Sequence, residues 1–175
     1  MRQPGRPRLA LALCCGALAI DVNTALLAAV DAAGLPTAHG GVLRLLQATG
    51  SAAFGGGAVG QWWRAVLVPV TAGPAFQLGF HIAAGLAMAV FYVAVVRHLP
   101  PCRVWPNAVA YAMGVWLLNA AVVLPLIGEG FAGSRNLSLA GMAAFAAIHT
   151  VFFLLLAGLY QQLSGVPESR RGAAS

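Results

Sequence analysis

Hydrophobic residues gather in four long stretches of the chain, and shorter segments rich in glycine, proline and arginine separate them. The stretches cover about residues 9–30, 75–96, 107–127 and 137–160. Each is long enough to cross a hydrocarbon core of about 30 Å as an α-helix that rises about 1.5 Å per residue. The pattern therefore predicts an all-α fold, an integral membrane four-helix bundle.

The composition agrees with a membrane location. Hydrophobic residues make up 60% of the 175 residues and charged residues only 8%, whereas an average soluble domain has about 25% charged residues. Such a chain cannot cover a water-soluble surface, so we expect the lipid bilayer to be its main surroundings. The length suits a single transmembrane domain over residues 1–164, followed by a short polar tail at 165–175 that we expect to be disordered.

The first apolar stretch has two interpretations. Arginines at positions 2, 6 and 8 precede it, and residues 17–19 (ALA) look like a cleavage site, so a signal peptide is one of them. However, the apolar character continues to Val30, which gives enough residues to span the membrane. We favour a retained first helix.

The segment at 31–74 differs from the four stretches because glycine, proline and small residues dominate it. Its two apolar pieces, 42–46 and 65–70, are too short to span a bilayer. The first is amphipathic, and Trp62 and Trp63 have the character of interfacial anchors, which predicts a segment lying at the membrane surface. A re-entrant segment covered by protein is the alternative.

The net charge of +6 comes from arginines that are scattered through tails and connections, which argues against a nucleic-acid-binding face. Positively charged connections are instead retained in the cytoplasm, so arginine counts give the orientation. One side of the membrane receives Arg2, Arg6, Arg8, Arg97, Arg103, Arg170 and Arg171, and the other receives Arg44, Arg64 and Arg135. The count predicts that the N and C termini are both cytoplasmic.

Three motifs carry a resemblance to a known family. They are LRLLQA at 43–48, NAAVVLPL at 119–126 and SLAG at 138–141. With these motifs the chain resembles an uncharacterised family of small bacterial four-span integral membrane proteins, from residue 43 to the end of the last stretch. It departs from the family pattern at 60–74. The resemblance implies a multi-pass protein of the bacterial inner (cytoplasmic) membrane, and it implies no activity.

Polar residues inside the predicted spans are the candidate functional residues, since an ionisable group at bilayer depth costs about 2.5 to 3.5 kcal/mol. Counting helix rise from the cytoplasmic side places Asp21 and Asn119 about 18 Å up, His81 about 21 Å and His149 about 12 Å. We expect these four side chains to form a buried polar cluster near the midplane. Asn23 points about 200° away from Asp21 around the helix and need not join them.

Two hypotheses explain such a cluster. In the first, the side chains form hydrogen bonds between helices and fix the register of the bundle. In the second, Asp21 accepts a proton or orients a histidine, while His81 and His149 carry protons or bind a metal. Bis-histidine haem ligation is a specific version of the second. The estimated height difference between the histidines, about 9 Å, argues against it.

No catalytic motif accompanies these residues. Gly55, Gly56 and Gly57 lack the Lys-Ser/Thr of a phosphate-binding loop, and we find no zinc spacing or nucleophile elbow. Enzyme activity and cofactor therefore stay open, and we assign no metal ligand. The sequence favours a structural or regulatory membrane component that supports a membrane protein partner or a homo-oligomer. A small transport or redox module that uses the buried Asp and His residues is the alternative.

Two further expectations concern the end of the third span. Pro125 is the one candidate for a helix break there. The glycine-rich segment at 128–135 should form a tight turn, in which Glu129 is solvated or pairs with Arg135.

Overall fold

The computed structural model describes residues 6–35, 37, 41–54, 56–96, 98 and 104–164. In this part of the chain every regular element is helical. The four long helices are α1 (Arg6–Ala32), α5 (Pro74–Val96), α6 (Val104–Leu118) and α8 (Leu139–Leu163). The tail predicted to be disordered, 165–175, lies outside the described residues, as do several of the arginines that were counted for orientation.

Four helical segments are long and apolar enough to cross a membrane: Arg8–Ala32, Pro74–Val96, Val104–Leu126 and Leu139–Leu163. The prediction of an all-α membrane helical bundle is therefore confirmed. The helix ends differ by a few residues from the predicted ones because hydrophobicity marks the part of a helix inside the bilayer, and capping groups outside it decide where the helix stops. Ser138 is such a group, since its hydroxyl accepts a hydrogen bond from the Gly141 N–H at 3.1 Å and starts α8.

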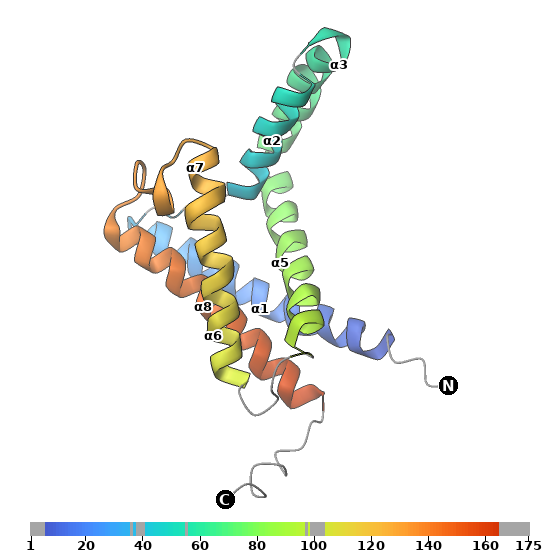
Figure 1. Ribbon diagram of the computed structural model, residues 1–175, viewed down its shortest axis with the longest axis vertical. Helices are drawn as coiled ribbons and strands as arrows, with labels where there is room; N and C mark the ends of the chain where they lie inside the picture. Colours follow the sequence, from blue (N-terminus) through green and yellow to red (C-terminus); the bar gives the residue numbers. More distant parts are fainter. Residues whose placement is uncertain are drawn as a thin grey trace, which may run out of the picture.

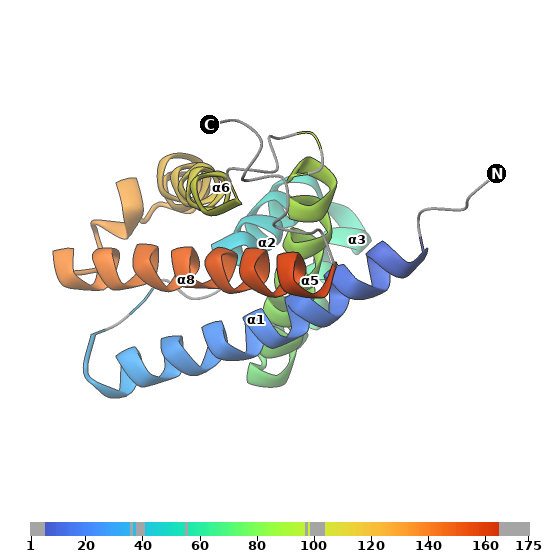
Figure 2. The same ribbon diagram turned by 90° about the horizontal axis from the view of Figure 1, so that it is seen from below.

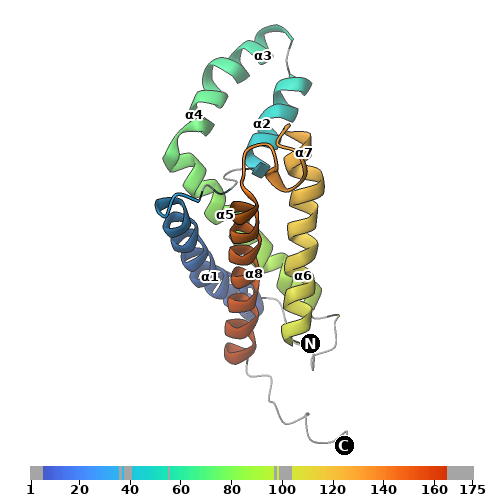
Figure 3. The same ribbon diagram turned by 90° about the vertical axis from the view of Figure 1, so that its left-hand side faces the viewer.

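The four long helices form two pairs that cross (Figures 1 and 2). α1 and α8 lie side by side, and α5 packs against α1 while α6 packs against α8. The beginning of α1 and the end of α8 lie at one end of the bundle (Figure 3). At the opposite end, the segment between α1 and α5 projects beyond the long helices. We call these two ends the terminal end and the hairpin end.

Small residues allow α1 and α5 to approach closely. A Cβ atom added to Gly16 would lie 2.6 Å from the Cβ of Ala89, and one added to Gly85 would lie 2.5 Å from the Cδ1 of Ile20. Non-bonded carbon atoms do not approach so closely, so a larger residue at either place would displace its neighbour. Close backbone approach through small residues is the usual source of packing energy between membrane helices, where lipid removes the hydrophobic driving force.

The segment predicted to lie at the interface or to re-enter the membrane folds as a helical hairpin. One arm is α2 (Gly41–Ala53), and the other runs through α3 (Gly57–Trp62), the π-helical turn η1 (Trp63–Leu67) and α4 (Val68–Ala72). The indole of Trp63 lies over Gly50, where an added Cβ would be only 2.1 Å from the ring, and its N–H donates to the Ser51 hydroxyl at 3.1 Å.

The two tryptophans that were predicted to be interfacial anchors differ in their exposure. Trp63 packs between the two arms and is half-buried, whereas Trp62 is 54% exposed. Of the two, only Trp62 thus has the exposure that an interfacial anchor needs. Anchoring, and the position of the hairpin on or in the membrane, stay predictions.

The connection between α7 (Leu124–Leu126) and α8 corrects one expectation. Glu129 is neither solvated nor paired with Arg135: it is 6% exposed, and its carboxylate accepts a hydrogen bond from Arg44 of α2. Arg135 instead donates to the Gly128 carbonyl at 2.9 Å. The turn folds Glu129 back under the base of the hairpin, and a buried carboxylate needs a charged partner there. The ion pair therefore joins the hairpin to the bundle.

Candidate functional site

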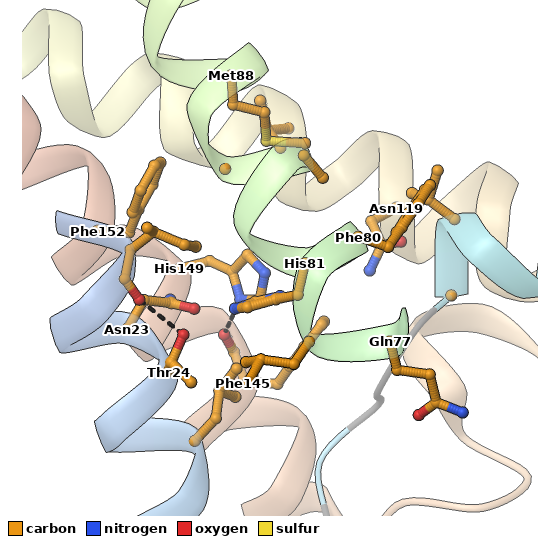
Figure 4. A pocket seen from close by; sticks show the side chains of 18 of the residues that line it. Asn23, Thr24, Gln77, Phe80, His81, Met88, Asn119, Phe145, His149 and Phe152 are labelled. Atoms are coloured by element: carbon orange, nitrogen blue, oxygen red, sulfur yellow. Dashed lines mark hydrogen bonds between the residues drawn. The ribbon is translucent and has the colours of Figure 1, made fainter. Parts of the chain in front are cut away.

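A cavity of about 410 Å³ lies in the half of the bundle nearer the hairpin, between α5 and α6. Its floor comes from α1 and α8, and Gly41 and Val42 at the start of α2 contribute to one wall. Most of the lining is apolar. The polar residues that line it are Asn23, Thr24, Asp31, Gln77, His81, Asn119 and His149 (Figure 4).

Aromatic rings close the other half of the space between α5 and α6. Tyr92 of α5 meets Tyr111 of α6 with ring centroids 5.3 Å apart, and Tyr111 meets Phe153 of α8 at 4.9 Å. Phe91 also lies against Tyr111, at 6.3 Å. The first two contacts are edge-to-face, which is a favourable geometry for aromatic pairs, and the third is tilted. The cavity is thus confined to the hairpin end of the bundle.

His149 lies on α8 with its ring held in one orientation. Its Nδ1 is 2.9 Å from the carbonyl oxygen of Phe145, one turn earlier, and its ring centroid is 4.2 Å from that of Phe145. A carbonyl oxygen can only accept, so we assign the proton of the neutral imidazole to Nδ1. Nε2 then carries a lone pair, and no hydrogen bond to it is formed within the described residues.

Asn23 of α1 lies against α8 with a 2% exposed side chain. Its amide N–H donates to the Ile148 carbonyl at 3.3 Å, which fixes the orientation of the amide. Its Oδ1 is buried and has no hydrogen-bond partner among the residues that the structure describes. In Figure 4 the amide end of Asn23 points toward the imidazoles of His149 and His81.

Asp21 lies apart from the other predicted residues, because it is exposed on α1 and does not line the cavity. The face that packs is instead a stripe at a spacing of three or four residues: Ala12, Cys15, Ala19, Ile20, Asn23 and Leu27 are its buried members. The regular small residues in the first half of this stripe are the signal that would have pointed to Asn23.

The other three predicted residues line one cavity. His81 comes from α5 and His149 from α8, and their imidazoles point toward one another across the floor (Figure 4). Asn119 lies on the α6 wall. The predicted height difference of about 9 Å between the histidines assumed parallel helices. Since α8 crosses α5 obliquely (Figure 1), equal heights do not follow from equal residue counts.

Asn119 opens the π-helical turn η3 (Asn119–Val123), which joins α6 to α7 without a break. The N–H of Leu124 bonds to the Asn119 carbonyl, five residues earlier, instead of to the carbonyl four residues earlier. Pro125 follows at once, and its ring would crowd a carbonyl of the preceding turn in a regular α-helix. The candidate break is therefore a local widening of the helix, a feature that often occurs at functional sites.

Metal coordination by protein side chains alone finds no support in the part of the chain that the structure describes, where no group of three or more His, Cys, Asp or Glu residues could hold an ion. Sequence reasoning missed four polar lining residues and had no means to detect the cavity: Asn23, Thr24, Asp31 and Gln77. In comparisons with protein-family models, curated proteins and solved structures, nothing matches the chain. Its resemblance to small bacterial four-span proteins thus stays a prediction.

Proposed function

We propose that this protein is a membrane-embedded binding module, which takes a small lipophilic molecule from the bilayer into the cavity between α5 and α6. The observation that carries the proposal is the convergence of His81 and His149 on a cavity of about 410 Å³. Small-molecule sites typically have volumes of about 300–1,000 Å³, mostly apolar walls and a few polar groups. The cavity has each of these features.

Exposed residues along the side of the cavity support the entry of a ligand from the membrane. Leu78 of α5 and Leu118 of α6 line it and are also 48% and 59% exposed. The opening thus lies between two helices that are both apolar enough to span a bilayer. A lipophilic molecule could enter sideways without passing through water.

The structural or regulatory role that the sequence favours needs no such cavity. Helices held together only by polar contacts would bury those polar groups in pairs, since a buried acceptor that lacks a donor costs free energy. Asn23 keeps such an acceptor at the cavity. The second sequence hypothesis, a transport or redox module with buried histidines, therefore agrees better with the site, with Asn23 in place of Asp21.

The proposal also includes the membrane and the orientation of the protein in it. We place both termini on the cytoplasmic side of a bacterial inner membrane, on the distribution of arginines and the resemblance described above. The cavity, being at the end away from the beginning of α1, then lies in the outer half of the bundle. All four long helices belong to one domain in this proposal.

A matched pair of variants tests the proposal. Ala84 lines the cavity, whereas its neighbour Ala83 is exposed on the outside of α5. Wild type, Ala84→Phe and Ala83→Phe are extracted from native membranes in polymer nanodiscs, and their bound small molecules are compared by mass spectrometry. We expect a molecule that is retained by wild type and Ala83→Phe and is depleted about 10-fold in Ala84→Phe, a loss equivalent to about 1.4 kcal/mol.

Thermal melts of the three proteins show whether Ala84→Phe is folded. If its melt resembles that of Ala83→Phe and all three proteins carry the same molecules, the cavity is not a binding site and the proposal is wrong. An absorbance spectrum of the same samples after haem supplementation identifies haem by its Soret band. That outcome would assign the cavity to the bis-histidine version.

A further inference from the structure

We propose that the ligand is a neutral aromatic amphiphile that donates a hydrogen bond from a ring hydroxyl, of the phenol or hydroquinone type. This inference rests on the proposed function, because it names the chemical class that the cavity accepts. It further states that the site prefers a hydroquinone to the corresponding quinone.

The wall formed by α1 and α8 presents hydrogen-bond acceptors. Asn23 donates an amide N–H to the Ile148 carbonyl, which leaves its buried Oδ1 to accept. His149 donates the N–H of its neutral ring to the Phe145 carbonyl, which leaves the lone pair of Nε2 to accept. Three acceptors result when Thr24 is included, because its hydroxyl donates to the Ile20 carbonyl at 2.8 Å.

A ligand that satisfies this wall must bring a proton of its own. A hydroxyl group or an N–H does so, whereas the oxygen of a carbonyl or an ether would meet Oδ1 and Nε2 lone pair against lone pair. His81 and Asn119 on the other walls can each donate or accept, so neither changes the preference. The wall therefore selects for donors.

Aromatic side chains make up part of the cavity lining. Phe80, Trp116, Phe145 and Phe152 all line the cavity, and the Met88 thioether adds a polarisable contact. Rings of this kind pack well against another ring in offset or edge-to-face arrangements. A flat aromatic headgroup thus fits the cavity better than a flexible hydroxylated chain, and its apolar tail would leave between α5 and α6.

A cationic donor such as an amine fits less well. Asp31 also lines the cavity, but it lies eight residues beyond Asn23 along α1, a distance of about 12 Å at the helical rise. Asp21 is exposed on the far side of α1. A charge at the wall of Asn23 and His149 would therefore be buried at membrane depth next to neutral groups, which is costly. A neutral hydroxyl avoids that cost.

Three probes that share one ring and one tail test the inference: decyl-hydroquinone, decyl-quinone and the dimethyl ether of the hydroquinone. Their affinities for wild-type protein in nanodiscs are measured anaerobically by calorimetry, with empty nanodiscs as the blank. We expect the hydroquinone to bind about 10-fold more tightly than either of the others, the ratio expected for one lost hydrogen bond to a buried acceptor.

Two variants and one control locate the effect. In Asn23→Leu and in His149→Phe, the advantage of the hydroquinone over its ether should fall below 3-fold, while the ether still binds. Asp21→Asn changes an exposed residue of the same helix and should leave all three affinities as in wild type. The affinity of the ether serves as a folding control, because it requires the cavity and no acceptor.

Each remaining result would overturn the inference. Equal affinities for the three probes, tighter binding of the quinone, or a hydroquinone preference that survives in both variants would remove the acceptor wall as the cause. Tighter binding of a decyl-ammonium probe would assign a cation instead. If no probe binds while Ala84→Phe still loses its co-purified molecule, the ligand class is wrong but the proposed function stands.

Discussion

The space between α5 and α6 is filled at one end of the bundle and open at the other. At the terminal end, Tyr92, Tyr111 and Phe153 fill it with rings in edge-to-face contact. At the hairpin end the same two helices border a cavity with buried polar atoms on its floor. Ring contacts join α5 to its neighbours at the terminal end, whereas the hairpin end leaves room between α5 and α6.

The contacts that hold the two ends differ as much as their packing does. Rings that touch on all sides lose many dispersion contacts when one ring is removed. The hairpin end depends instead on the ion pair between Arg44 and Glu129 and on a turn that contains Ala132 at a φ of 53°. The cavity therefore lies at the end of the bundle where polar and charged contacts, and not stacked rings, join the helices.

We expect the largest loss of stability when a buried ring is removed at the terminal end. Phe153→Ala removes a fully buried ring, and we expect a loss of about 3 kcal/mol, at the low end for such a truncation because lipid rather than water surrounds the unfolded side chain. Phe145→Ala at the cavity should cost only about 1 kcal/mol, since part of its surroundings is already empty. Reversible unfolding in mixed detergent micelles measures both. Equal losses would contradict the comparison.

The ion pair at the hairpin end should have the next largest effect. Arg44→Met leaves the carboxylate of Glu129 buried without its partner, and we expect a loss of about 2 kcal/mol in the free energy of unfolding. The same unfolding measurement applies.

The double variant Arg44→Met/Glu129→Met serves as the control for this prediction. It removes the buried charge together with its partner, so it should recover most of the loss. A double variant that is as unstable as Arg44→Met would show that packing of the Arg44 side chain, and not its charge, joins the hairpin to the bundle.

The smallest effect is expected at the strained turn. Ala132 adopts a left-handed backbone conformation that glycine adopts without steric cost. Ala132→Gly should therefore stabilise the protein by about 0.5–1 kcal/mol. Ala143→Gly, at an exposed position inside α8, is the matched control and should destabilise it by about 1 kcal/mol. The prediction is wrong if both substitutions change stability in the same direction.

The overall fold could be predicted from the sequence because a bilayer imposes one simple requirement on it. A spanning segment must satisfy its backbone internally and be apolar over about 20 residues, and four segments of this chain meet both conditions. The hairpin of α2 to α4 could not be predicted in the same way. Its arms are held by specific contacts such as Trp63 on Gly50, which hydropathy does not encode.

The site could be predicted only in part. Composition alone marks His81, Asn119 and His149 as unusual at bilayer depth, and all three line the cavity. On α1 the same reasoning chose Asp21, the more costly residue, although the helix turns Asn23 inward. Which side of a helix packs depends on the neighbours it meets, and a helix that is apolar all round gives little periodic signal to decide it.

The π-helical turn at Asn119–Val123 also has a consequence for sequence comparison. Such a turn contains one residue more than an α-helical turn, so the helix before it and the helix after it are out of step by about 100°. A relative that lacks one residue here would align with a single gap inside a transmembrane helix, where gaps are normally rejected. In that relative, the residues before and after the turn would face the cavity in a different combination.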